Sequence, residues 1–172
     1  MTPQKLGPAI AVAALCLAVA APQGASAEAV EVDAVLAPSE QIRLDFEDGS
    51  GRLVLFVRSE GRAEGSGPFA GATVSEYGMH DTSSGGTGSP RGYLVFARDD
   101  GSTAYVRWQG RIVSMPAADG GGSRLLGHGF WEVVGGTGDL AGLEGAGTLH
   151  IHPPTGTGRR FVLSGELVAT DQ

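Results

Sequence analysis

Hydrophobic and polar side chains alternate with a period of two in short runs along most of this chain. Because successive side chains of a strand point to opposite faces, this alternation is typical of strands with one buried face. After residue 28 no segment sustains the apolar period of a helix. The pattern therefore predicts an all-β chain of about eight strands. The runs lie at residues 42–46, 52–58, 73–80, 92–98, 103–113, 124–134, 145–151 and 160–169.

Polar, glycine-containing segments connect these runs. Segments 47–51 and 99–102 are short and rich in residues that tolerate positive φ, so each is expected to join its flanking strands as a hairpin. Segments 82–90 and 114–123 are longer, and loops of this kind frame the mouth of a barrel. We therefore predict a single antiparallel up-and-down β-barrel, since closure removes the exposed sheet edges. Its interior would hold side chains or one small ligand.

Residues 28–40 show no clear pattern beyond a short alternation from Val30 to Val35. We interpret them as an extended lead-in that pairs with a barrel edge or covers one end. The barrel domain is then predicted to comprise residues 41–172.

The segment from Gly127 to Leu149 contains a strand, a glycine-rich corner and a second strand. Gly-Gly-Thr-Gly at 135–138 allows a tight corner, and later glycines let a bent strand pass close to its neighbours. A phosphate-binding loop is disfavoured, because no helix follows and no lysine lies nearby. The segment resembles the signature of the allene oxide cyclase and dirigent barrel-like superfamily, of which the chain would be an exported bacterial member.

This resemblance implies a barrel whose lumen handles a small apolar molecule. Allene oxide cyclases act mainly by steering a bound epoxide, helped by an interior Glu and a water, but that set is not matched here residue by residue. One hypothesis is a cyclase or isomerase in which confinement selects one conformer of the substrate. The alternatives are a non-catalytic binding or carrier protein and a structural domain that acts through its surface. Related barrels often form dimers or trimers, which leaves a homo-oligomer open.

Residues 1–27 have the form of a secretory signal peptide, with Lys5, an apolar run over 9–21 and Ala25-Ser26-Ala27 before the cleavage point. The run is shorter than the roughly 20 residues needed to span a bilayer. Cys16 follows Leu15, where a lipoprotein site requires a small residue. We therefore predict a secreted or periplasmic protein that begins at Glu28 and does not insert into a membrane.

Removal of this leader would leave a chain without cysteine or lysine. Thiol nucleophiles, thiolate metal sites and lysine Schiff bases are then excluded. The chain without the leader has eleven arginines and nineteen acidic residues, which gives a formal net charge of −8. This charge disfavours nucleic acid and anionic membranes as partners. We expect a small neutral, apolar or cationic ligand, and no cofactor.

Glu76 and His80 share one face of the predicted strand 73–80, whereas Tyr77 and Met79 lie on the other. If the first face looks inward, Glu76 is a carboxylate in an apolar lumen and a candidate general acid or base. If it looks outward, both are ordinary solvated groups. We predict that Glu76 points inward with Tyr105 or Trp108 near it, and that Glu76, His80 and Tyr105 are the catalytic residues.

Aromatic side chains gather on the neighbouring predicted strands and are candidates for a ligand-binding pocket, although burial in the core is the more common explanation for such residues. These residues are Tyr93, Phe96, Trp108, Phe130 and Trp131. Arg107 and Arg111 could clamp a carboxylate or be plain surface arginines.

His150 and His152 lie on one face of a predicted strand. With His80 or His128 they could form a zinc or copper site. Alternatively, the apolar face of this strand is buried and both imidazoles lie in solvent. We favour the second interpretation and predict no metal.

Overall fold

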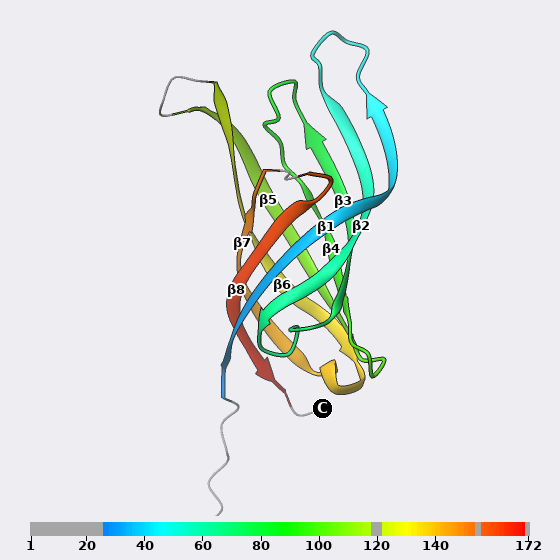
Figure 1. Cartoon of the computed structure of the whole chain (residues 1–172), viewed down its shortest axis with the longest axis vertical. Coiled ribbons are helices and arrows are strands. Elements are labelled where there is room, and N and C mark those ends of the chain that lie inside the picture. Colours follow the sequence, from blue (N-terminus) through cyan, green and yellow to red (C-terminus); the bar gives the residue numbers. More distant parts are fainter. Residues whose placement is uncertain (1–25, 118–121, 154–155, 171–172) are drawn as a thin grey trace, which may run out of the picture.

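The computed structural model describes residues 26–117, 122–153 and 156–170, and most of the predicted leader lies outside this range. It is a closed barrel of eight strands in chain order, each antiparallel to its neighbours, as predicted (Figure 1). Within the described residues, no helix is long and apolar enough to cross a membrane. The strands are β1 (Glu28–Asp45), β2 (Leu53–Ser66), β3 (Thr73–Thr82), β4 (Arg91–Ala97), β5 (Thr103–Pro116), β6 (Ser123–Thr137), β7 (Leu143–Ile151) and β8 (Arg159–Ala169).

Residues 28–40 are not a lead-in but the first half of β1, which pairs with β2 on one side and β8 on the other. Val30, Val32 and Leu36 alternate into the core, each 1% exposed. The sequence pattern is interrupted because the register shifts between Pro38 and Glu40, which moves the later residues out of phase. This strand therefore closes the barrel.

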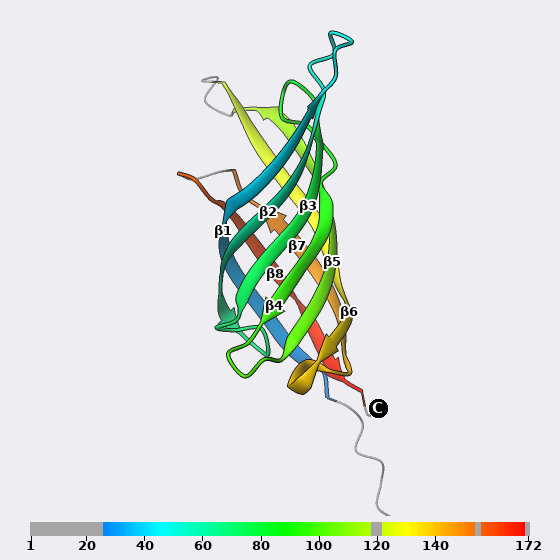
Figure 2. The same ribbon diagram turned by 90° about the vertical axis from the view of Figure 1, so that its right-hand side faces the viewer.

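One end of the barrel is filled by apolar side chains. The loop between β2 and β3 places Phe69, which is fully buried, inside this end. Its ring stacks on Phe96 at 4.5 Å between centroids and meets Trp131 edge-on at 6.4 Å. Leu140 of the short 3-10 helix Gly138–Leu140 is also buried in the core. The β2–β3 and β4–β5 connections, this helix and the C-terminus all lie at the same end (Figure 2).

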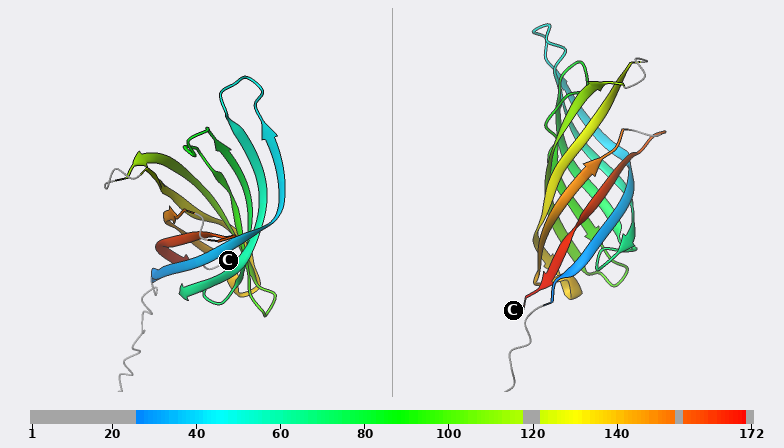
Figure 3. Two further views of the ribbon diagram at one scale, coloured as in Figure 1. Left: turned by 45° about the horizontal axis from the view of Figure 1, so that its top comes forward. Right: turned by 90° about the vertical axis from the view of Figure 1, so that its left-hand side faces the viewer.

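The opposite end is open and uneven. The β1–β2 and β5–β6 strand pairs rise well beyond β7 and β8, so the rim is low on the β7–β8 side (Figure 3). Residues 39–45 of β1 are exposed on both faces, as expected for strands that extend past the packed core. Arg159, the first residue of β8, lies on the low rim.

Candidate functional site

Strand β3 carries Glu76 and His80 on its inner face, where they are 2% and 7% exposed. His80 Nε2 lies 2.9 Å from Glu76 Oε1. Four residues of extended strand span about 13 Å, so these side chains meet only by leaning toward each other over the residue between them. That residue is Gly78, and a Cβ added there would lie 2.7 Å from Glu76 Oε1 and 2.8 Å from His80 Nε2. The missing side chain therefore permits the pair.

Trp108 of β5 is buried and packs beside this pair. Its ring meets the His80 ring edge-on at 6.0 Å and the Phe161 ring at 5.5 Å. Between β3 and β5, Gly92 of β4 lies opposite both Gly78 and Trp108. A Cβ at Gly92 would lie 2.1 Å from the Tyr77 carbonyl oxygen and 2.8 Å from Gly78 Cα, so β3 and β4 approach closely here. The indole of Trp108 supports one side of the imidazole.

Arg159 completes a chain of polar groups. Its Nη1 atom lies 3.0 Å from His80 Nδ1. Burial lowers the pKa of this guanidinium, opposed by the charge of Glu76, yet arginine stays protonated in proteins and can only donate. His80 Nδ1 must therefore accept. In neutral His80 the proton is then on Nε2, which donates to the Glu76 carboxylate.

A cavity of about 150 Å³ opens above these residues. Leu36, Pro38, Leu55 and Val57 form an apolar part of its wall, and the other side chains of the lining are polar, with Arg159 at the rim. The lining residues are Leu36, Pro38, Gln41, Leu55, Val57, Ser59, Glu76, His80, Thr157, Gly158 and Arg159. The cavity combines an apolar wall with a few convergent polar groups, as small-molecule sites commonly do. Its carboxylate and imidazole can accept or donate protons.

The predicted inward direction of Glu76 is confirmed, and Trp108 lies beside its partner His80. Tyr105 was expected near them, but it is 42% exposed and on the outer face. It is separated from Trp108 by an odd number of positions in one strand, so the two side chains point to opposite faces.

The aromatic residues that were predicted to form one pocket lie on opposite sides of the barrel wall. Phe96 and Trp131 are buried, but they pack in the closed end and do not line the cavity. Tyr93 and Phe130 are about half exposed and belong to the outer face, so their placement in the lumen was wrong. Phe130 and Trp131 are adjacent in one strand, and alternation alone separates them.

Arg159 and Ser59 are two of the polar lining residues that the sequence analysis did not select. Arg159 was placed just before the last predicted strand, and the β-strand in fact begins with it. It shares a face with Phe161 and Leu163, both buried, so its inward direction follows once the strand is extended. Ser59 is 3% exposed and pairs in register with Glu76.

His150 of β7 and His152, which follows this strand, lie in solvent. Leu149 and Ile151 are buried, which leaves His150 and His152 exposed as we favoured. His150 faces His128 across β6 and β7 at 4.4 Å between ring centroids, whereas His80 is inside the barrel and cannot join them. Within the described ranges, no group of three or more potential ligands forms a metal site.

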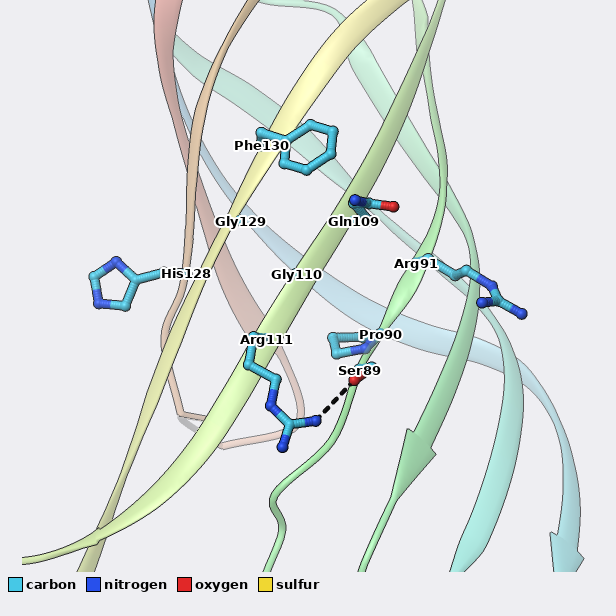
Figure 4. A pocket seen from close by; sticks show the side chains of 9 residues that line it. All are labelled: Ser89, Pro90, Arg91, Gln109, Gly110, Arg111, His128, Gly129 and Phe130. Carbon is cyan, nitrogen blue, oxygen red and sulfur yellow. Dashed lines mark hydrogen bonds between the residues drawn. The ribbon is translucent and has the colours of Figure 1, made fainter.

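A second hollow of about 370 Å³ lies outside the barrel over β4, β5 and β6 (Figure 4). Arg111 donates from Nη1 to Ser89 Oγ at 2.9 Å along its edge, and the His128 ring points away from this pair. Arg107 instead pairs with Glu132. No carboxylate lines this hollow, so the interior cavity is the better candidate for acid–base chemistry.

No protein-family model and no curated protein matches the sequence. Among solved structures, the chain is similar to a beta-barrel like protein of Acinetobacter baumannii, with 13% identity, a TM-score of 0.55, and coverage of 86% of this chain and 98% of the other. A pterocarpan synthase dirigent protein matches with 13% identity and a TM-score of 0.49, covering 91% and 96% of the respective chains. Similarity at these identities establishes the barrel fold alone.

Proposed function

We propose that the barrel binds a small molecule in the cavity at its open end and that Glu76 transfers a proton within it. The observation that carries this proposal is the buried Glu76–His80 pair, held at 2.9 Å beside an apolar wall. Burial of an unpaired carboxylate or imidazole destabilises the folded protein, because the group loses its hydration. A core with only a structural role could hold apolar side chains at these positions instead. The presence of this ionisable pair beside a cavity supports a chemical role for it.

The reaction class that fits best is an isomerisation or cyclisation that starts with proton transfer. Glu76 takes a proton from a carbon that lies between a carbonyl group and a C=C bond; the electron pair of that C–H bond forms the new C=C bond of a dienolate, and the carbonyl π pair moves to oxygen. When the carbonyl group re-forms, the old C=C pair takes the proton back from the same carboxyl at the far carbon, so the double bond shifts and atoms and charge balance without a cofactor. The hydrogen bond from His80 Nε2 orients the carboxylate, and the apolar wall excludes water.

A non-catalytic carrier is the second candidate, because one observation favours it. Arg159 occupies the His80 Nδ1 lone pair, which is the basic site of the neutral ring. While this contact holds, the imidazole cannot accept a proton there. His80 then cannot relay protons between Glu76 and solvent, and in a carrier both groups would serve only to orient a ligand.

The test begins with mass spectrometry of small molecules that co-purify from the native host, followed by assays with the compound recovered. Glu76→Gln is nearly isosteric and should keep the fold. For an enzyme we expect turnover to fall by about 100-fold or more, with little change in affinity for a neutral ligand. Glu144→Gln is the matched control, since Glu144 is exposed on β7. Turnover that survives Glu76→Gln would exclude this residue as the proton carrier. Binding of the recovered compound by the parent protein without any turnover would support the carrier hypothesis instead.

A further inference from the structure

Arg159 differs from the arginines of the outer face. In the described part of the chain, six arginines pair with a carboxylate: Arg43, Arg52, Arg58, Arg98, Arg107 and Arg160. Four others form no ion pair but are exposed to solvent: Arg62, Arg91, Arg111 and Arg124. Arg159 is partly buried inside the barrel, yet no carboxylate of the described residues lies within ion-pair distance of it. A buried cation is expected to be paired. The nearest structural partner is neutral His80, which uses one of the five guanidinium N–H groups.

The remaining N–H groups belong to a guanidinium that lines the cavity. A guanidinium presents paired donors in a planar fork that matches a carboxylate. The apolar side chains of Leu36, Leu55 and Val57 face the same space. A protein cavity of about 150 Å³ can accommodate benzene, and the volume here is about 150 Å³.

We propose that the cavity selects a ligand with one small ring and a carboxylate, and that Arg159 binds the carboxylate. This inference rests on the proposed small-molecule site and adds the chemical class of the ligand. The ring lies against the apolar wall, and the carboxylate replaces or shares the contact of Arg159 with His80. The anion also lies on the far side of the imidazole from Glu76, so His80 separates the two carboxylates.

The experiment compares benzoate with benzyl alcohol, a neutral molecule of similar size, by calorimetry and by Trp fluorescence, since Trp108 packs on His80. We expect the full chain to bind benzoate at least about tenfold more tightly than benzyl alcohol. Arg159→Gln should remove this preference and leave benzyl alcohol affinity within about twofold. Arg160→Gln is the matched control, because its side chain is on the outer face and pairs with Asp33.

Arg159→Lys provides a second variant that keeps the charge without the fork, and it should retain part of the preference. Equal affinity for the two probes, or equal loss of both in Arg159→Gln, would overturn the proposed ligand class while leaving a small-molecule site in place. Binding of neither probe at millimolar concentration would overturn both the ligand class and the use of this cavity.

Discussion

The carboxylate of Glu76 and the imidazole of His80 hydrogen-bond at 2.9 Å across Gly78, although four residues separate them along an extended strand. This relationship depends on the absence of a side chain on the inner face at position 78. A single glycine in the strand is thus what allows the pair to form. Among the described residues, Glu76 and His80 are the only buried ionisable pair that lines the cavity.

Gly78→Ala should therefore disrupt the site. Position 78 does not have a positive φ, so alanine fits the backbone, but its methyl group would lie 2.7 Å from the Glu76 carboxylate. We expect the pair to separate and the free energy of unfolding to fall by about 1–3 kcal/mol, because buried polar groups lose their partner. Equilibrium urea unfolding and any ligand assay would measure both effects.

Gly135→Ala is the control for this substitution, since a Cβ there meets nothing closer than Tyr105 Cδ2 at 3.9 Å. It should behave like the parent protein. A Gly78→Ala protein with unchanged stability and ligand affinity would show that the Glu76–His80 contact has no role in either.

The closed end should be the main source of stability. Phe69 is fully buried and stacked on Phe96, so Phe69→Ala leaves a cavity and should cost about 3–5 kcal/mol. Tyr105→Ala removes an aromatic ring from the outer face and should change the unfolding free energy far less. A comparable loss in both variants, measured by denaturant unfolding, would mean that Tyr105 is covered by a partner.

Most of the architecture could be predicted from the sequence because strand alternation is local. Eight strands and their antiparallel order follow from side-chain period and turn composition. The corner predicted at 135–138 starts later, because β6 continues to Thr137 and the positive-φ Gly138 begins the turn. The first half of β1 was missed for a local reason too, since the irregularity near Pro38 breaks the period. Which face of each strand points into the barrel depends on the neighbouring strands, so it could not be predicted from one strand alone.

The candidate site was only partly predictable for the same reason. Glu76 and His80 could be assigned to one face, but not to the inside. Arg159 is 79 positions from His80 in sequence and meets it only because the barrel closes. Such a contact is set by strand order and register, which no single strand encodes.

The glycine corner gives a prediction about backbone conformation. Gly138 has a φ of +57°, and a Cβ there would lie 2.5 Å from Ser102 Oγ. A Cβ at Gly136 would lie 2.1 Å from the Leu140 carbonyl oxygen. We expect Gly136→Val and Gly138→Val each to lower the unfolding free energy by about 1–3 kcal/mol or more, through strain at one site and collision at the other. Wild-type denaturation midpoints for both variants would disprove this description of the corner.

The ion pair between Asp33 and Arg160 links β1 to β8, where the barrel closes. The hydrogen bond from Arg160 is the main cause that lowers the pKa of Asp33, and burial opposes it. A carboxyl group with a lowered folded pKa adds stability above its unfolded pKa of about 3.9. This stability is lost as the pH falls through the folded value.

Asp33→Asn should therefore reduce stability at pH 7, and the difference from wild type should disappear in acid, once the pH is below the lowered pKa of Asp33. The pair is partly exposed, so we expect less than about 1 kcal/mol at low salt and less still at high salt. A double-mutant cycle with Arg160→Gln, followed by urea unfolding across this pH range, isolates the interaction. A coupling energy that does not fall between pH 7 and a pH below the lowered pKa of Asp33 would show that Asp33 ionisation does not hold β1 against β8.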